Sequence, residues 1–211
     1  MVKTEDIIRS VRTILDHNVS SSQLAALQDE VGTLDLDTII KDSIRPAAMQ
    51  LMQVVPVELA TLKTQRQERT TAELPPISIS LPADFLRFVS CSLATWDYPV
   101  TELKAAGSRE HMREFGEFES LKATGHRPLA VQGESSVTLY GGGATRLGEL
   151  TYIGMPDINE ESISIDDRLY DPMCYTIAAL ACEVLKDTQK ADSMLQTARS
   201  LMVSAEQETT K

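Results

Sequence analysis

The chain has 211 residues, of which 42% are hydrophobic, 5% aromatic and 24% charged, and its formal net charge is −11. This length suits one domain, or a domain with an appendage, built around an aliphatic core. No apolar run approaches the roughly 18 residues of a membrane span. The N-terminus alternates charged and apolar residues, unlike a signal peptide. We therefore expect an intracellular, soluble protein without a membrane partner.

The negative charge is concentrated in residues 156–187, which carry eight acids against two bases, whereas residues 188–211 carry three of each sign. Affinity for nucleic-acid phosphates comes from clustered Lys and Arg. No segment of this sequence holds such a cluster. The composition therefore excludes a protein that grips nucleic acid by charge.

The first segments favour helix. Residues 4–16 place apolar side chains on one stripe, with Thr4 as the expected N-cap and two acids in the first turn. The stretch 17–23 is polar and breaks the pattern, and residues 23–31 predict a short helical turn. We expect the first helix to bury its apolar stripe.

A stronger helical pattern covers residues 36–54, where apolar residues recur at intervals of three and four. Pro46 lies inside it and removes one backbone donor, which predicts a kink or a split near Ile44. Residues 63–74 are polar and carry no apolar stripe. We interpret 63–74 as an exposed loop.

The middle of the chain has strand patterns. Residues 76–82 alternate Ile with Ser, and residues 85–96 continue as a second strand after a turn. Residues 105–120 are compatible with a short helix or with an extended loop. Three further short strands, separated by glycine-containing turns, are expected at 128–132, 135–141 and 147–154. We expect these three to form a small antiparallel meander.

The C-terminal part favours helix again. Asp171 is the expected N-cap and Pro172 stands at the first helical position, which proline prefers. An apolar stripe that includes Leu180 and Val184 runs to Leu185, and a second helix follows Asp187. We expect these two helices to form an antiparallel hairpin.

Together these elements predict an α+β fold. Its helix bundle would be formed by the N- and C-terminal helices, with a small antiparallel β-sheet inserted between them. The expected domain organisation assigns residues 1–74 to the N-terminal helices, 75–155 to the inserted sheet, and 156–211 to the C-terminal helical hairpin. Leu180 should be buried between that hairpin and the 36–54 helix.

Few residues suggest chemistry. The three cysteines, Cys91, Cys174 and Cys182, lack metal-ligand spacing and are interpreted as small core residues. His111 and Glu114 would share a helix face, but no partner pair follows them, so a solvated surface is the favoured interpretation. We therefore expect no enzyme, no cofactor and no metal.

Three further stretches fall short of known motifs. The glycine-rich stretch 141–148 lacks the Lys-Ser/Thr ending of a phosphate loop and is interpreted as a hairpin tip. Residues 157–168 begin like a calcium loop but carry Ser162 at the required Gly and Arg168 at the required Glu. The adjacent pair Asp166 and Asp167 is interpreted as surface charge that flanks a helix.

Two short motifs carry a family resemblance. The order of elements, the stretch "LPADFLRFVSCSLATW" and the stretch "LYDPMCYTIAALACEVLKD" resemble the head-to-tail connector (adaptor) proteins of tailed bacteriophages. These include the tail-tubular adaptors of short-tailed phages and the ring proteins of crAss-like phages. The resemblance covers residues 36–203. The matching positions are Leu81, Pro82, Asp84, Phe85, Leu86, Arg87, Tyr170 and Pro172.

The resemblance implies a structural role in the virion, in the neck or tail, after assembly in the host cytoplasm. Such adaptors form homo-oligomeric rings, usually twelvefold, below the portal protein. They extend the DNA channel, let genomic DNA pass without tight binding, and dock the next tail or ring protein. The charged 105–127 segment is longer than the resemblance predicts, and we expect it to contact a neighbouring component.

The resemblance also suggests a place for the acidic block, because like charge keeps passing DNA from sticking to a channel wall. Candidates for the channel or a ring interface are Asp157, Glu160, Glu161, Asp166 and Asp167. The alternative is an intracellular helical binding or scaffold module without catalytic activity. A hydrolase that uses the pair at 166–167 with a metal is the enzymatic rival. Self-assembly would favour the adaptor over both.

Overall fold

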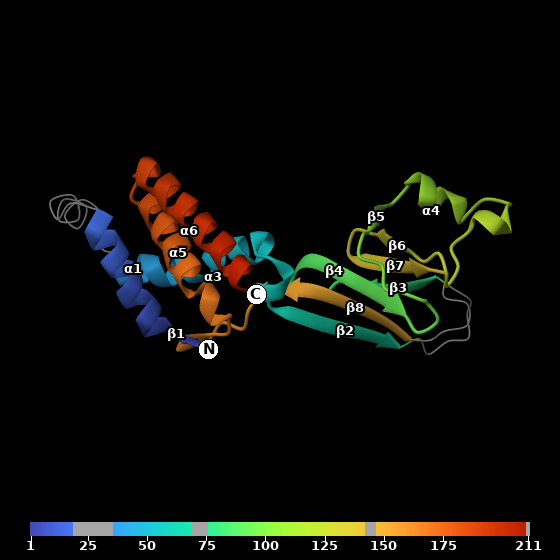
Figure 1. Cartoon of the computed structure of the whole chain (residues 1–211), viewed down its shortest axis with the longest axis horizontal. Helices are drawn as coiled ribbons and strands as arrows, with labels where there is room; N and C mark the ends of the chain where they lie inside the picture. Colours follow the sequence, from blue (N-terminus) through green and yellow to red (C-terminus); the bar gives the residue numbers. More distant parts are fainter. Residues whose placement is uncertain (19–35, 69–75, 142–146, 210–211) are drawn as a thin grey trace. The chain divides into compact units, whose positions relative to one another are not determined.

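A computed structural model describes residues 1–18, 36–68, 76–141 and 147–209 of the chain. It combines helices with several small sheets, which confirms the expectation of a mixed α and β fold (Figure 1). The chain divides into two compact units. Unit 1 comprises Met1–Thr61 and Met155–Lys211, and unit 2 comprises Leu62–Gly154.

Unit 1 is mainly helical. Its helices and short strands are β1 (Val2–Lys3), α1 (Thr4–Asn18), α3 (Leu36–Val54), η1 (Val57–Leu59), β9 (Ser162–Ile163), η3 (Asp167–Leu169), α5 (Tyr170–Val184) and α6 (Thr188–Thr209). Helix α5 contacts α1, α3 and α6. Strands β1 and β9 pair antiparallel, so the two chain segments that make this unit are also joined by backbone hydrogen bonds.

The core of unit 1 follows from the amphipathic spacing. On α1, the side chains of Ile7, Val11 and Leu15 are fully buried, as the stripe predicts. Helix α5 is apolar on most of its surface, which suits a helix that three neighbours cover. Its small buried residues, such as Ala178 and Ala181, let those neighbours approach closely. Among the described residues, no helix is both long and apolar enough to cross a membrane.

Unit 2 contains two sheets and a short helical segment. Its elements are β2 (Leu62–Glu68), β3 (Ile77–Ser80), β4 (Phe85–Leu93), β5 (Lys104–Ala105), α4 (Arg109–Arg113), η2 (Glu119–Leu121), β6 (Leu129–Gln132), β7 (Ser136–Tyr140) and β8 (Leu147–Gly154). One sheet has the order β2-β8-β4 and the other the order β3-β7-β6-β5. All neighbours are antiparallel except β5 and β6.

The two sheets share one hydrophobic core. Side chains from both sheets gather there, including Ile79 of β3, Leu93 of β4, Leu139 of β7 and Leu150 of β8. Gly148 permits this approach, because a Cβ at that position would lie 3.1 Å from Ile79 Cδ1. Burial of aliphatic side chains on one face of each sheet therefore holds unit 2 together.

The structure corrects two expectations about strands. The 63–74 segment was expected to be a loop, yet β2 occupies 62–68 and pairs with β8 along its whole length. Its polar side chains form no apolar stripe, so backbone pairing decides its conformation. The meander is also wrong, because β6 and β7 form a hairpin whereas β8 belongs to the other sheet.

Two capping expectations are also wrong. Thr4 is the first residue of α1, and its buried Oγ1 has no hydrogen-bond partner among the described residues. Asp171 lies inside the first turn of α5, and the chain enters that helix through η3, where the Asp166 side chain accepts a hydrogen bond from Arg168 N–H. The expected helical turn at 23–31 and most of the glycine-rich tip lie outside the described residues.

Candidate functional site

The family-like motif at 81–87 forms the turn from β3 into β4. Leu81 N–H donates to the Ser135 carbonyl oxygen at 2.9 Å, and Phe85 N–H donates to the Pro82 carbonyl oxygen at 3.0 Å. Pro82 supplies a fixed φ and no N–H of its own, which suits a turn that begins where β3 ends. This turn places the Asp84 side chain against the three-stranded sheet.

Asp84 joins three segments that lie far apart in the sequence. Lys63 Nζ of β2 donates to Asp84 Oδ2 at 2.9 Å, and the Tyr152 hydroxyl of β8 donates to Asp84 Oδ1 at 3.0 Å. The ring of Phe85 packs against that of Tyr152, with centroids 5.8 Å apart. Gly154 leaves room for the ion pair, since a Cβ there would lie 2.7 Å from Lys63 Cδ and 3.0 Å from Asp84 Oδ2.

The electrostatics of this junction favour a charged Asp84. Burial opposes ionisation, but the hydrogen bonds from Lys63 and Tyr152 and the Lys63 charge outweigh it, and the pKa of Asp84 is lowered. Burial, followed by the bond to Asp84, raises the pKa of Tyr152. The junction therefore holds a salt bridge and a neutral phenol, which fasten the turn to the sheet.

The other motif residues of this segment are half-buried in β4 and at its start. Leu81, Pro82, Phe85, Leu86 and Arg87 all belong to this class. The register between β4 and β8 shifts between Phe85 and Arg87, as in a β-bulge. A bulge re-aims the side chains next to it and increases the local twist. The motif therefore determines the local geometry at the start of β4, the longest described strand of unit 2.

The second motif begins α5 and connects it to α1. The Tyr170 hydroxyl donates to the Asp6 carbonyl oxygen at 3.0 Å, and it lies 2.7 Å from Ser10 Oγ. Burial is the largest of the influences that raise the pKa of this phenol. Pro172 is buried in the first turn of the helix. Both residues thus serve the packing of unit 1.

The acidic candidates lie on the segment that leads into α5. Asp157, Glu160, Glu161 and Asp167 are exposed, whereas Asp166 is half-buried. The chain turns sharply at Asn159, whose Oδ1 accepts hydrogen bonds from the N–H groups of Glu161 and Ser162 at 3.0 and 2.7 Å. Glu160 and Glu161 therefore stand on a tight turn.

Asp166 forms an ion pair with Arg168. Arg168 donates to it from its backbone N–H, from Nε and from an Nη at 2.8–2.9 Å. The hydrogen bonds from Arg168 lower the pKa of Asp166. The neighbouring Asp167 is exposed, and it lines a shallow hollow with Lys3, Asp6 and Arg9. The adjacent pair of carboxylates is therefore split between a structural cap and the surface.

The residues weighed for metal binding form hydrogen bonds inside the 105–127 segment. Gly107 N–H donates to His111 Nδ1 at 3.0 Å, and His111 Nε2 lies 3.1 Å from the Tyr140 hydroxyl. Glu114 Oε1 accepts from Ala123 N–H at 2.6 Å. Within the described parts of the chain, no three His, Cys, Asp or Glu residues are grouped as ligands of a metal ion.

The three cysteines are buried and free. Burial raises the pKa of Cys91 to about 12. Burial is also the main cause for Cys174, where the pKa is raised to about 12. A thiol with so high a pKa holds almost no thiolate at neutral pH and is a poor nucleophile or ligand. Their interpretation as core residues is confirmed.

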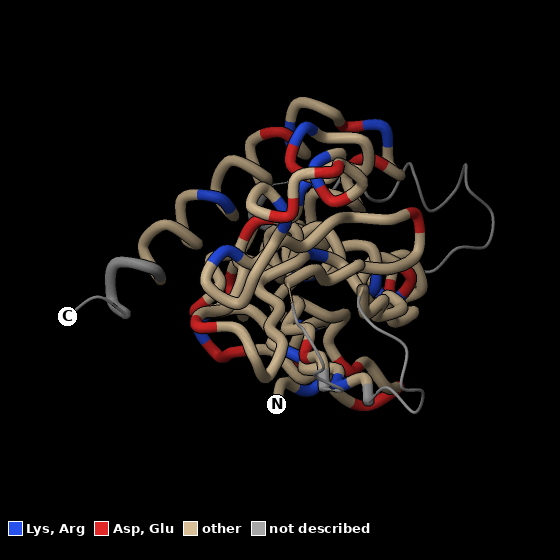
Figure 2. The backbone as a smooth tube through the Cα atoms, turned by 90° about the vertical axis from the view of Figure 1, so that its right-hand side faces the viewer, with Lys and Arg blue, Asp and Glu red and all other residues tan. Residues whose placement is uncertain are grey.

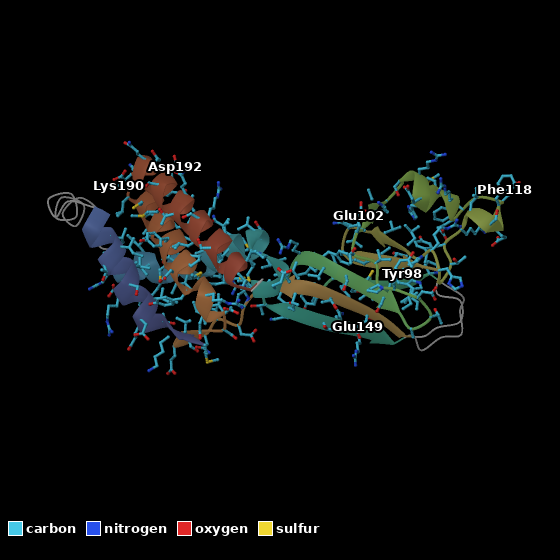
Figure 3. The ribbon with its side chains drawn as sticks, in the orientation of Figure 1. Tyr98, Glu102, Phe118, Glu149, Lys190 and Asp192 are labelled. Atoms are coloured by element: carbon cyan, nitrogen blue, oxygen red, sulfur yellow. The ribbon has the colours of Figure 1, made fainter. Side chains whose placement is uncertain are left out.

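A group of large apolar side chains in the 105–127 segment lies exposed at the surface, and no sequence pattern predicted this exposure. We call Met112, Phe115, Phe118 and Leu121 the aromatic loop; their exposures are 58, 70, 70 and 46%. They occupy α4, η2 and the residues between, and neither α4 nor η2 has a buried residue. Figure 3 shows Phe118 at the outer edge of the loop that follows α4.

No protein-family model matches this chain, and no curated protein matches it. Function must therefore be argued from the residues themselves and from the motifs that they form.

Proposed function

We propose that this chain is a structural adaptor of a bacteriophage head-to-tail connector. In this proposal the N- and C-terminal helices form one bundle, and unit 2 is an insertion carried by it. The observation that carries the proposal is the order of elements combined with the two motifs. The first motif precedes and begins β4, and its Asp84 accepts a hydrogen bond from Tyr152. The second begins α5, and its Tyr170 donates a hydrogen bond to the Asp6 carbonyl oxygen.

The chemistry of the described residues is compatible with a structural role. The family-like residues are engaged in a salt bridge, in hydrogen bonds between segments and in packing. Lys and Arg are interspersed with Asp and Glu along the described backbone (Figure 2). A passage for DNA works best with walls that do not hold phosphates tightly. We propose that some of Asp157, Glu160, Glu161 and Asp167 face such a passage or an adjacent ring.

The direct test is localisation in the particle. Antibodies against the chain, used in immunogold electron microscopy of virions of the phage that encodes it, should label the junction between head and tail. Virions that lack the chain entirely, while containing all other head and tail proteins, would overturn the proposal.

A second measurement addresses assembly. Co-expression with the portal protein of the same phage should yield a ring; twelve copies of the 23.2 kDa chain would add about 280 kDa to the portal. A chain that stays monomeric and unbound beside assembled portal rings would favour the helical scaffold module instead. Multi-angle light scattering of the purified complex distinguishes the two outcomes.

A further inference from the structure

The aromatic loop is an unusual surface. Single exposed apolar residues are normal, but four large ones within ten positions form a patch of the kind found at interaction sites. Phe115 touches His111 edge-on, with ring centroids 5.1 Å apart, and still exposes 70% of its surface. Burying this patch against a partner would release the water that it now orders.

The backbone that carries the patch is firmly held. Ser108 caps α4 by accepting from His111 N–H, and Glu114 accepts from Ala123 N–H. An Nη of Arg127 donates to the carbonyl oxygens of Ser120 and Lys122 at 2.8 and 2.6 Å. Polar contacts thus hold the backbone of the loop while its four large apolar side chains stay exposed. Such pre-organisation lowers the entropy lost on binding.

Unit 1 carries a groove of matching character. It is lined by residues of α3 and α6 and by Thr176 of α5, and it has a volume of about 320 Å³. Its apolar lining includes Leu51, Val54, Leu195 and Met202, and Val54 is 62% exposed. Arg199 supplies the charged part of the lining. We call this the α3–α6 groove.

Charge favours a pairing of the two surfaces. Residues 109–122 carry four acids and three bases; Glu117 and Glu119 flank Phe118, and Glu119 forms an ion pair with Lys122. Arg199 is the one charged residue among those that line the groove. An acidic side chain of a partner would therefore meet a positive charge at this position of the groove. Complementary charge steers and orients such a contact.

We propose that the aromatic loop of one copy docks in the α3–α6 groove of a second copy. The two surfaces differ, so each copy offers one of each, and the contact is heterologous. Repetition of a heterologous contact gives a ring or a filament. The inference deepens the proposed function and rests on it for the expectation that copies associate in series.

The size of the patch predicts a weak single contact. Two phenylalanines at 70% exposure present on the order of 250 Å² of surface, whereas a stable interface buries about 800 Å² on each partner. The test must therefore trap the contact covalently. The native cysteines are buried and poor in thiolate, so introduced thiols can be read without a large background.

The experiment mixes two variants of the full chain. Ser120→Cys places a thiol beside the aromatic loop, and Gln50→Cys places one in the groove. Under mild oxidation the mixed dimer should form several-fold faster than with Thr101→Cys, an exposed control in unit 2, in place of Ser120→Cys. Mixed dimers no faster than this control would overturn the proposal.

Second substitutions identify the forces. Phe118→Ser in the Ser120→Cys chain should abolish most of the excess cross-linking. Arg199→Glu in the Gln50→Cys chain should weaken it, and Glu117→Lys in the partner should restore it. Lys41→Glu, an equal charge reversal elsewhere on α3, should leave it unchanged. If Lys41→Glu and Arg199→Glu weaken cross-linking equally, the charge argument is wrong.

Other binding partners of the aromatic loop would give different results. Ser120→Cys chains that cross-link mainly with one another would indicate a symmetric loop-to-loop contact. Co-sedimentation with neutral lipid vesicles that Phe118→Ser abolishes, without mixed dimers, would assign the loop to a bilayer. Either result overturns the groove contact. If the mixed dimers form but the chain is absent from virions, the adaptor proposal is wrong and the contact between loop and groove is still supported.

Discussion

At the scale of single residues, Asp84 connects segments that lie far apart in the sequence. Its oxygens accept hydrogen bonds from Lys63 and Tyr152, whose sequence separations from it are 21 and 68 residues. Asp84 was singled out in the sequence by a motif, but neither partner was. Contacts across such separations depend on how the strands pair, which no local pattern encodes.

The Asp84 junction should make the stability of unit 2 depend on pH. The pKa of Asp84 is lower in the folded than in the unfolded chain. The charged Asp84 therefore stabilises the fold above the unfolded-state pKa of about 3.9, and this stabilisation is lost as the pH falls through the folded-state pKa. The side chains of Lys63 and Asp84 are 27 and 33% exposed. After solvent screening we expect Asp84→Asn to cost about 1 kcal/mol at neutral pH.

Urea unfolding provides the measurement. The difference between wild type and Asp84→Asn should shrink as the pH is lowered toward about 3. Lys63→Met serves as the control, since the double variant should lose less than the two single variants together. An Asp84→Asn difference of equal size at both pH values would show that the charge of Asp84 contributes nothing.

Gly125 provides a second prediction at this scale. A Cβ at Gly125 would lie 2.6 Å from the Thr95 carbonyl oxygen, a backbone atom of the turn that follows β4. We expect Gly125→Ala to destabilise unit 2 by about 1–3 kcal/mol through overpacking. At Gly116 the nearest atom would be 3.4 Å away, an ordinary contact. Thermal unfolding should therefore separate Gly125→Ala from Gly116→Ala, and equal midpoints would contradict the steric argument.

At the scale of elements, α5 corrects the sequence-based choice of core residues. Leu180 was expected to be buried, but it is only half-buried, and Val184 is 57% exposed. Ile177 is fully buried in the same helix. Because nearly every position of α5 is apolar or small, the three-four spacing cannot identify the buried face. Its neighbours on three sides decide it.

The resulting prediction is an order of effects along α5. Ile177→Ala should cost about 2–5 kcal/mol, because it leaves a cavity in a fully packed core. Leu180→Ala should cost less and Val184→Ala least, since their solvent exposure rises in that order. Chemical unfolding of the three variants measures the order. A larger loss for Leu180→Ala than for Ile177→Ala would restore the sequence-based expectation.

The other elements differ in how far the sequence specified them. Helices α1 and α3 have apolar stripes that follow from their own residues, and both were predicted. Strand β2 has no such signal, because its polar sequence becomes a strand through pairing with β8. The exposure of Phe118 also escaped prediction, since phenylalanine in a sequence normally indicates a core position.

At the scale of the whole molecule, the charge distribution predicts weak contact with DNA. The chain has a net charge of −11, and phosphate affinity requires several cations on one surface. The purified protein should bind duplex DNA more weakly than about 10⁻⁴ M at physiological salt. Fluorescence anisotropy of a labelled duplex at low and physiological salt measures this. Micromolar affinity with a steep salt dependence would refute a passive channel.

The pairing of Leu62 with Ile153 has a consequence for how the chain folds. These residues lie near the two ends of unit 2, so the folded unit holds the two chain segments of unit 1 close to each other. If unit 2 were unfolded, bringing the two segments of unit 1 together would cost about 4 kcal/mol of free energy, because the long loop between them loses entropy on closure. During synthesis, all of unit 2 emerges before α5, the helix that contacts α1, α3 and α6. A defect in unit 2 would therefore delay the completion of unit 1 without altering any residue of its core.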